Sequence, residues 1–484
     1  MKQINCFITY NENDQAQKTA QNLLASKLVN KVFLLTNKKL ENSIPGVETM
    51  VIDALFSHET VSKIAAVSDT KYSLIYTKDT TLELGQYALE RFFYIAESTN
   101  AGMVYADYYE IKEGVRSNLP LIDYQEGSLR DDFNFGSVLF YNSTMLKQAV
   151  AETTSQYKHA GFYNLRLKVS QQGELFHINE YLYSEVEFDT RKSGEKLFDY
   201  VDPKNRAIQI EMELACTDHL KQIGGYLAPD FKKIEFNEGS FPVEASVIIP
   251  VRNRVKTIDD AIRSVLSQKT NFKFNLLVVD NFSNDGTSEI IEEIAKTDSR
   301  LIHIVPNRSD LGIGGCWNAG VDSPLCGKFA IQLDSDDIYE TENTIQKIVD
   351  AFYEQNCAMV IGSYTMTNFK METIAPGLID HKEWTPENGR NNALRINGLG
   401  APRAFYTPVL REIKVPNTSY GEDYALGLAI SRKYQIGRIY DSIYMCRRWD
   451  ENSDASLDVV RMNGHNLYKD KIRTIELKAR KNLK

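Results

Sequence analysis

The sequence KFAIQLDSDDIYE at residues 328–340 decides the fold, because another part of the chain repeats it. KYSLIYTKDTTLE at residues 71–83 aligns with it without a gap. Further along, AGMVYADYYE (101–110) aligns in the same way with CAMVIGSYTM (357–366). Two such matches in the same order along the chain are typical of an internal repeat. We therefore expect two copies of one fold in tandem.

Short β-rich segments alternate with helical patterns in both copies, which predicts an α/β fold with mixed, mostly parallel sheets. In the second copy, Thr257 is expected to begin a helix, with Asp260 three residues after this cap. Strands are expected at 7–11, 31–37, 48–53 and 71–77 in the first copy, and at 245–251, 274–280, 300–305 and 328–334 in the second.

The repeat divides the 484 residues into four parts. Residues 1–200 form the first copy, 201–244 a helical segment and linker, 245–450 the second copy, and 451–484 a basic helical tail. Each copy is long enough to bury a core of its own.

Composition excludes several classes of protein. The net charge of −9 and the pI near 5.5 argue against a general nucleic-acid binder, which needs a basic face. The six cysteines form no C-x-x-C pairs, so reduced and packed thiols are expected rather than disulfides or a zinc site. No apolar run suits a signal peptide or a spanning helix, and we expect a cytoplasmic protein. The basic tail is either a solvated helix or a peripheral contact with the inner face of a membrane.

Acidic residues follow two of the expected strands of the second copy. In open α/β sheets, ligands bind beyond the carboxyl ends of the strands, where Asp280 and Asp334 stand. Asp334 and Asp336, two residues apart in LDSDD, could present carboxylates to one Mg²⁺ or Mn²⁺, with diphosphate oxygens completing its coordination. The alternative is that these acids only cap the next helix.

Five motifs of the second copy, taken in order, resemble those of family-2 glycosyltransferases of the GT-A fold. They are IIPVRNR, VVDNFSNDGT, DLGIGGCWNAG, LDSDD and GED, and the resemblance covers about residues 245–450. It implies two tandem GT-A-like domains and an inverting transfer of a hexose or N-acetylhexosamine from a nucleotide-diphosphate donor, with UDP as the expected nucleotide. The implied acceptor is a glycan or a lipid-linked glycan in the synthesis of a cell-surface polysaccharide or glycoconjugate.

The resemblance also implies roles for individual residues. Asp334 and Asp336 correspond to the ribose and metal contacts, and Asp423 to the general base. Residues implied to bind the nucleotide-sugar are Pro250, Arg252, Asp280, Asn281, Asn318, Asp334, Ser335 and Arg448. The chain departs from the family at Trp317, where an arginine commonly precedes the asparagine, so a phosphate contact gives way to stacking or packing. Candidates for a third protein ligand of the metal are Asp450, Glu451 and His465.

A physical argument for Asp423 stands beside the resemblance. Inversion by direct displacement needs a base for the acceptor hydroxyl proton and a Lewis acid for the leaving diphosphate. A carboxylate and a divalent ion meet both needs. The alternative is that Glu422 and Asp423 are only the acidic first turn of the helix that follows.

The first copy lacks the acids that align with Asp280, Asp334 and Asp423 and keeps the one that aligns with Asp336. The corresponding positions hold Thr36, Thr77, Lys78, Asp79, Phe162 and Tyr163. The charge of Lys78 would repel a cation, and we expect an inactive copy that packs, orients the chain or binds acceptor glycan. One alternative is a second active site that uses Asp79 with Asp107 or Asp131. The other is a carbohydrate-binding scaffold in which neither copy is catalytic. Donor, acceptor, linkage and oligomeric state depend on pocket shape rather than on motifs.

Overall fold

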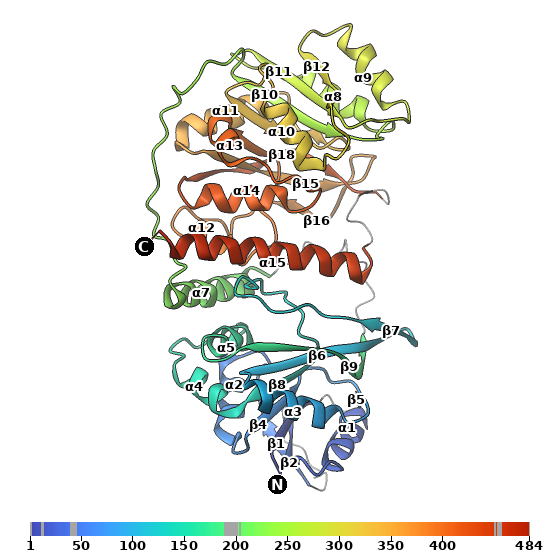
Figure 1. Cartoon of the computed structure of the whole chain (residues 1–484), viewed down its shortest axis with the longest axis vertical. Coiled ribbons are helices and arrows are strands. Elements are labelled where there is room, and N and C mark those ends of the chain that lie inside the picture. Colours follow the sequence, from blue (N-terminus) through green and yellow to red (C-terminus); the bar gives the residue numbers. More distant parts are fainter. Residues whose placement is uncertain are drawn as a thin grey trace. The chain divides into compact units, whose positions relative to one another are not determined.

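A computed structural model describes residues 2–10, 14–38, 46–187, 202, 205–449, 452 and 457–483. The chain forms two compact units, each with a nine-stranded sheet (Figure 1). The first unit comprises Met1–Lys192, Lys204–Tyr226 and Leu457–Leu477. The second comprises Ser193–Pro203, Leu227–Ser456 and Lys478–Lys484. The segment after the second sheet thus returns to the first unit.

The elements of the first unit alternate as the sequence predicts. Its strands are β1 (Ile4–Thr9), β2 (Val29–Thr36), β3 (Val47–Val51), β4 (Tyr72–Tyr76), β5 (Glu83–Leu84), β6 (Met103–Lys112), β7 (Val115–Leu119), β8 (Val138–Asn142) and β9 (Leu175–Glu187). Its helices are α1 (Asp14–Leu24), α2 (His58–Val67), α3 (Ala88–Thr99), α4 (Ser143–Ala151), α5 (Gly161–Val169), α7 (Arg206–Ile223) and most of α15 (Val459–Lys481).

The second unit repeats this arrangement. Its strands are β10 (Ala245–Val251), β11 (Phe274–Asp280), β12 (Leu301–Ile304), β13 (Phe329–Gln332), β14 (Ile338–Tyr339), β15 (Met359–Thr367), β16 (Thr373–Ile379), β17 (Arg403–Tyr406) and β18 (Ile436–Arg447). Its helices are α8 (Ile258–Leu266), α9 (Thr287–Ala295), α10 (Ile313–Val321), α11 (Thr344–Gln355), α12 (Gly389–Asn392), α13 (Thr407–Ile413) and α14 (Glu422–Ser431).

The two sheets have the same strand order. The first runs β3-β2-β1-β4-β8-β6-β9-β5, with β7 paired to β6, and the second runs β12-β11-β10-β13-β17-β15-β18-β14, with β16 paired to β15. In both, the first four strands of this order are parallel, and the next strand is antiparallel to its neighbours. The expectation of two tandem α/β domains with one topology is confirmed.

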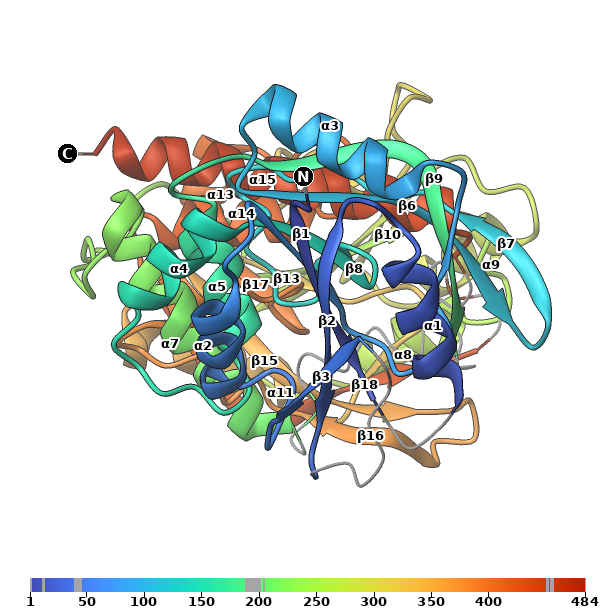
Figure 2. The ribbon, with the colours of Figure 1, turned by 90° about the horizontal axis from the view of Figure 1, so that it is seen from below.

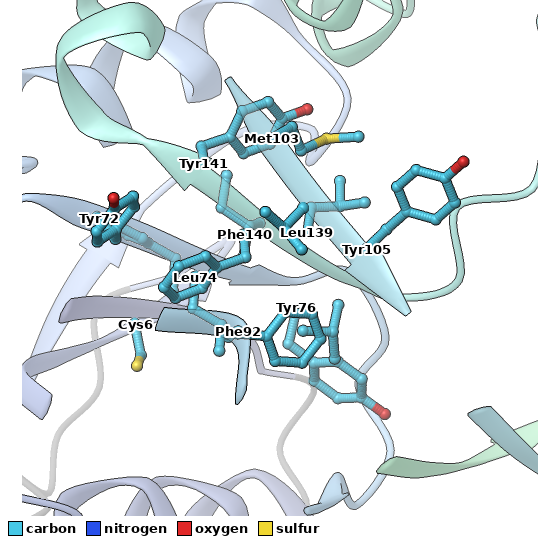
Figure 3. Close-up of a cluster of buried hydrophobic side chains, with 14 of the residues drawn as sticks. Cys6, Tyr72, Leu74, Tyr76, Phe92, Met103, Tyr105, Leu139, Phe140 and Tyr141 are labelled. Carbon is cyan, nitrogen blue, oxygen red and sulfur yellow. The ribbon is translucent and has the colours of Figure 1, made fainter. Parts of the chain in front are cut away.

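The core of the first unit explains why its parallel strands read as continuous apolar runs. Strands covered on both faces have no side that faces water. Figure 2 shows α1 and α2 on opposite sides of β1, β2 and β3. Figure 3 shows side chains from β4, β8 and β6 in one buried cluster, among them Leu74, Phe140 and Met103. All six cysteines are free thiols and five of them are buried, as expected from their spacing.

The start of α8 corrects one local expectation. Thr257 does not cap the helix with its side chain; its hydroxyl instead donates to the carbonyl of Ser335 at 2.9 Å. Asp260, expected three residues after the cap, accepts from Nη1 of Arg447 at 2.7 Å. Both side chains therefore tie α8 to the segments that follow β13 and end β18.

The C-terminal helix packs against a loop of the first unit. The hydroxyl of Ser128 donates to Oδ2 of Asp470 at 2.9 Å, and the amide of Gly127 donates to the hydroxyl of Thr474 at 3.0 Å. This side of α15 is buried, so the interpretation of the tail as a solvated helix does not hold for it. Among the described helices, none has the length and apolar character needed to span a membrane.

Candidate functional site

The site of the second unit lies at the carboxyl edge of its parallel strands. β10 pairs in parallel with both β11 and β13, so these three strands end at the same edge. Asp280 is the last residue of β11, and Asp334 follows the end of β13 by two residues. The topology therefore brings to one edge the two acids that the sequence indicates.

Asp280 is a fixed carboxylate. It is 1% exposed, and its oxygens accept hydrogen bonds from the backbone amide of Ser283 at 3.0 Å and from the hydroxyl of Ser288. Nε2 of His303 lies 3.3 Å from Oδ2 of Asp280. Burial alone would raise the pKa of Asp280, but hydrogen bonds from Ser283, Ser288 and His303 bring it below its ordinary value. Asp280 is therefore charged and rigid at neutral pH.

Three further residues of this edge differ in exposure. Pro250 is half-buried in β10, and Arg252, just beyond the strand, is exposed. Asn281 is buried; its Nδ2 donates to the carbonyl of Leu311 at 2.9 Å, and its backbone amide donates to Val251 at 2.8 Å. Its Oδ1 is buried and has no hydrogen-bond partner in the described part of the chain. A buried acceptor without a partner is unfavourable in the protein alone.

Asp334 lies among other charges. Its Oδ1 accepts from Nε2 of Gln332 at 2.8 Å, and its backbone amide donates to the hydroxyl of Tyr444 at 3.2 Å. Burial raises the pKa of Asp334, Arg403 opposes this, and the negative charges of Asp336 and Asp423 add to the rise. The D-S-D and G-E-D motifs, far apart in sequence, are therefore within electrostatic range of each other.

Asp337 and Ser335 of LDSDD form hydrogen bonds with neighbouring segments of the second unit. Asp337 is 5% exposed; it accepts from the backbone amide of Arg447 at 2.7 Å and from the hydroxyl of Tyr444 at 2.8 Å. Burial and the charges of Asp336 and Asp334 raise the pKa of Asp337 well above its usual range. Asp337 thus anchors the end of β18. Ser335, also buried, offers its carbonyl to Thr257.

Asp336 is held from the segment after β18. Its Oδ2 accepts from Nε1 of Trp449 at 3.4 Å and from Nδ2 of Asn452 at 3.2 Å. The carbonyl of Asp336 accepts from Nε of Arg447 at 2.5 Å. Sequence reasoning did not identify Trp449 or Asn452 as partners of this acid.

A continuous chain of polar contacts joins the D-S-D and G-E-D motifs. Asp423, in the first turn of α14, forms an ion pair through Oδ2 with Nη1 of Arg403. Nε and the backbone amide of Arg403 donate to Oε1 of Gln332 at 3.0 and 3.1 Å. Gln332 in turn donates to Asp334 at 2.8 Å. The order is Asp334, Gln332, Arg403, Asp423.

Gln332 and Arg403 were missed by the sequence reasoning, although the repeat contains a signal for them. In the alignment of the two copies, Ile75 occupies the place of Gln332, and Leu139 the place of Arg403. A change from apolar to polar residues in buried strands is unusual for a core. Comparing the copies inside the strands, and not only after them, would have identified both residues.

Glu422 is a buried acid beside Asp423. Burial first, and then the charge of Asp423, raises the pKa of Glu422 to about 7. Its Oε2 is buried and has no hydrogen-bond partner among the described residues. Both acids of G-E-D therefore lie in the first turn of a helix, as one interpretation predicted, and both also face the polar chain.

Three sequence-indicated positions have other partners. The side chain of Asn318 pairs with the backbone of Val415, donating to its carbonyl at 2.7 Å and accepting from its amide at 2.9 Å. Trp317 is buried and packs edge-on against Phe405, with ring centroids 5.9 Å apart. Arg448 is half-buried, and its backbone amide donates to Thr367 at 2.7 Å.

The carboxylates of the site suit a divalent cation. Repulsion from Asp336 and Asp423 contributes to the raised pKa of Asp334, and a cation would relieve it. Carboxylate oxygens are the ligands that Mg²⁺ and Mn²⁺ prefer. Within the described ranges, no group of three or more His, Cys, Asp and Glu side chains is placed to hold a metal. Asp450 and Glu451 lie outside those ranges, and His465 belongs to the first unit.

In the corresponding place of the first unit, a lysine is paired with two glutamates of the same unit. Nζ of Lys78 lies 2.7 Å from Oε1 of Glu185 and 3.1 Å from Oε2 of Glu187. The hydroxyl of Tyr163, where the second unit has Asp423, donates to the carbonyl of Leu129 at 2.5 Å.

Asp107, a candidate for a second active site, is also engaged. It accepts from the backbone amide of Leu121 at 2.7 Å, and Nε2 of His177 lies 2.8 Å from the same oxygen. The other ring nitrogen of His177 lies 2.9 Å from Asp123. Asp107 therefore connects a loop and a histidine within the first unit.

Part of the second unit matches a known protein family. Residues 246–407 match the family described as glycosyl transferase family 2. An uncharacterized glycosyltransferase of Haemophilus influenzae is 30% identical over 201 residues, which are 39% of this chain and 60% of that protein. The GalNAc(5)-diNAcBac-PP-undecaprenol beta-1,3-glucosyltransferase of Campylobacter jejuni is 33% identical over 93 residues, 19% of this chain and 29% of that protein.

A solved structure is also similar to this chain. TarS of S. aureus (residues 1–349, in complex with UDP-GlcNAc) is 21% identical, with coverage of 48% of this chain and 70% of that chain and a TM-score of 0.37. The matches span 60% of the length of the Haemophilus protein and 31% of the length of an uncharacterized glycosyltransferase of Rickettsia conorii. The family match itself includes β10 to β17 and both residues of the D-x-D pair. Residues 246–407 are therefore a domain of glycosyl transferase family 2.

Proposed function

We propose that the second unit transfers a sugar from a nucleotide-diphosphate donor to an acceptor hydroxyl, with inversion and with the help of Mn²⁺ or Mg²⁺. The observation that carries this proposal is the polar chain from Asp334 through Gln332 and Arg403 to Asp423. It connects Asp334, assigned to the donor, with Asp423, assigned to the acceptor. These two residues are 89 positions apart in the sequence. A salt bridge with a purely structural role would need only one of these acids, not one at each end of the polar chain.

The donor side of the site consists of the strand ends around Asp280. Its rigid carboxylate suits hydrogen bonds from a base or a ribose. The unpartnered Oδ1 of Asn281 is an acceptor that a bound nucleotide could satisfy after a small movement. Pro250, the exposed Arg252, Ser335 and Arg448 complete the proposed contacts. We do not assign Asn318 to the donor, because its amide is engaged by Val415.

On the acceptor side, Asp423 is proposed to take the hydroxyl proton. Its ion pair with Arg403 through Oδ2 fixes the carboxylate in one orientation. Asp334 and Asp336 would hold the divalent cation, which, when bound, would offset the charge that develops on the leaving diphosphate. Direct displacement then needs no nucleophile from the protein.

The acceptor and the cellular role are proposed by analogy. The name of the Campylobacter relative includes an undecaprenol-linked acceptor, which supports a lipid-linked glycan as the acceptor here. UDP is the expected nucleotide. Such an acceptor would require a cytoplasmic enzyme to work at the inner membrane face, in polysaccharide synthesis.

The first unit is proposed to lack transfer activity. Thr77 stands in place of Asp334, Lys78, paired with two glutamates, stands in place of Ser335, and Tyr163 stands in place of Asp423. An ammonium group in this place disfavours a cation. The unit retains its sheet and core, which suits packing or the binding of acceptor glycan.

A panel of nucleotide-sugars, incubated with Mn²⁺ and a mixed pool of glycan and lipid-linked acceptors, tests these assignments. We expect transfer by the wild type, and loss of at least about 100-fold in Asp336→Ala and Asp423→Asn. Asp79→Ala should transfer as the wild type does. Equal loss in Asp79→Ala would contradict the single active site, and activity retained in Asp423→Asn would remove the base assignment.

A further inference from the structure

We propose that Trp449 and Asn452, with Arg447, are positioning residues that hold Asp336 in the orientation in which its free carboxylate oxygen binds the divalent cation. We call these three residues the Asp336 support. The inference rests on the proposed function and extends it to residues that contact Asp336 from the end of β18 and just beyond it. It concerns the chain's own contacts, which exist in the protein without a metal.

Two donors converge on one oxygen of Asp336. Nε1 of Trp449 and Nδ2 of Asn452 both donate to Oδ2, at 3.4 and 3.2 Å. No contact of Oδ1 with another residue is recorded in the described part of the chain. Two hydrogen bonds on one oxygen restrict rotation of the carboxylate about its terminal bond. The other oxygen is thereby presented in one direction.

The orientation of Asn452 is itself determined. Its Oδ1 accepts from the backbone amide of Trp449 at 2.7 Å, so its amide nitrogen must point the other way. That nitrogen donates to Asp336 and, at 3.4 Å, to the carbonyl of Arg447. Asn452 therefore contacts both other residues of the support, and all three contact Asp336.

The support is anchored to the rest of the second unit. Arg447 donates from Nε to the carbonyl of Asp336 at 2.5 Å and from Nη1 to Asp260 at 2.7 Å. Its backbone amide donates to Asp337 at 2.7 Å. Both the main chain and the side chain of Asp336 are thus bound to the end of β18.

Packing fixes the indole of Trp449. Its ring centroid lies 5.0 Å from that of Phe369, and Nζ of Lys256 lies 5.7 Å from the ring. Arg447 in turn lies over Phe369, at 4.6 Å. An indole packed in this way can direct its single N–H at one acceptor, a role that a phenylalanine of similar shape cannot fill.

Residues that orient a ligand are known to affect metal affinity. Removing a hydrogen bond to a metal ligand typically weakens binding by about 10- to 100-fold. The contacts above give Trp449 and Asn452 this relation to Asp336. We therefore expect a loss of metal affinity when either donor is removed, even though neither residue supplies a ligand.

The test is a titration of the purified chain with Mn²⁺, alone and with a fixed concentration of UDP, followed by calorimetry and by tryptophan fluorescence. Trp449→Phe keeps the packing with Phe369, and Asn452→Ala removes the amide. Each should weaken Mn²⁺ binding by about 10-fold, while the melting temperature stays close to that of the wild type. Mn²⁺ should quench the wild type, and this quenching should be lost in Trp449→Phe. Mg²⁺, which is not paramagnetic, should compete without quenching.

The controls separate this inference from the proposed function. Trp384→Phe removes another buried indole and Asn271→Ala an exposed amide, and both should retain wild-type affinity and quenching. Unchanged affinity in Trp449→Phe and Asn452→Ala, with loss in Asp336→Ala, would overturn the support alone. No Mn²⁺ binding by the wild type, with or without UDP, would overturn both the support and the metal dependence of the proposed function.

Discussion

The two units share one topology, but two aligned positions in their buried strands are apolar in the first unit and polar in the second. In the first unit, Ile75 of β4 pairs with Leu139 of β8, and both side chains are buried in the apolar core. In the second, the aligned positions hold Gln332 and Arg403, which lead to Asp423. Buried polar groups add little net stability unless all are satisfied. The fold needs only the apolar version, so the polar version of the second unit indicates a function.

The two units also differ in how their charged side chains are paired. Lys78 of the first unit is surrounded by its own partners, Glu185 and Glu187. In the second unit, Asp334 and Glu422 both have raised pKa values, because burial and neighbouring acids disfavour their charged forms. In the first unit, Lys78 is paired with acids. In the second, neighbouring acids repel one another, and a bound cation would reduce this repulsion.

Replacing Arg403 should have the largest effect on this comparison. Arg403→Gln removes the ion pair with Asp423 and the link to Gln332, while keeping a polar side chain. We expect the transfer rate to fall about 100-fold, because the proposed base loses its fixed orientation. Steady-state kinetics with the donor found in the panel provide the measurement. Arg411→Gln, which changes an arginine bound to backbone carbonyls of Val321 and Ser323, is the matched control. A rate within twofold of the wild type for Arg403→Gln would show that the polar chain is only structural.

The first unit should respond to the loss of Lys78 in stability rather than in activity. Lys78→Met leaves Glu185, which is 2% exposed, without its cation. Breaking a buried pair from one side costs several kcal/mol, and the partial exposure of Lys78 reduces this to about 2 kcal/mol. Chemical denaturation, monitored by circular dichroism, would measure the loss. The double variant Lys78→Met/Glu185→Gln should recover part of it. If the single variant lost transfer activity instead, the first unit would have a catalytic role.

Glu422 should make the stability of the metal-free second unit depend on pH. Its pKa rises from 4.5 in the unfolded chain to about 7 in the folded protein. The folded state therefore binds the proton more tightly, and stability falls as pH rises from 4.5 to 7. Glu422→Gln should remove this part of the pH dependence, which amounts to about 1–3 kcal/mol. Melting temperatures at pH 5 and pH 8 should converge in the variant relative to the wild type. An unchanged difference between the two pH values would contradict the raised pKa.

His177 should give the smallest effect, and with a defined sign. Burial lowers its pKa, but hydrogen bonds with Asp107 and Asp123 raise it above the ordinary value of 6.5. A raised histidine pKa contributes stability that is present below pH 6.5 and is lost as pH rises through the folded value. His177→Gln should therefore destabilise the first unit by about 1 kcal/mol at pH 6 and by less at pH 9. His58, whose pKa burial lowers, is a control of opposite sign, since His58→Gln should destabilise the first unit less at pH 6 than at pH 9.

Most of the fold could be predicted from the sequence because apolar runs are a strong local signal. The expected strands 245–251 and 274–280 coincide with β10 and β11, and the helical stretch RAIQIEMELACTDHLKQI coincides with α7. The repeat extended this to the topology, since two aligned copies must share one strand order. Strand ends were less accurate, because hydrogen bonding rather than apolar character decides them: 328–334 was expected and β13 ends at Gln332.

The site could be predicted only in part, because its partners come from segments far apart in the chain. The motifs indicated Asp334, Asp336 and Asp423, and the structure joins them through the polar chain and its charges. No local pattern could show that Thr257 would bind Ser335 instead of capping α8. That contact depends on how close the two loops lie, which is a property of the tertiary fold.

The return of α15 to the first unit determines the order in which this protein can fold. Residues 457–477 supply Asp470 and Thr474 to the loop at Gly127 and Ser128. Chains are synthesised from the N-terminus, and early domains usually fold first. Here the first unit lacks a helix until the ribosome has passed the whole second unit. The first unit can therefore be completed only after the strands of the second sheet have been synthesised.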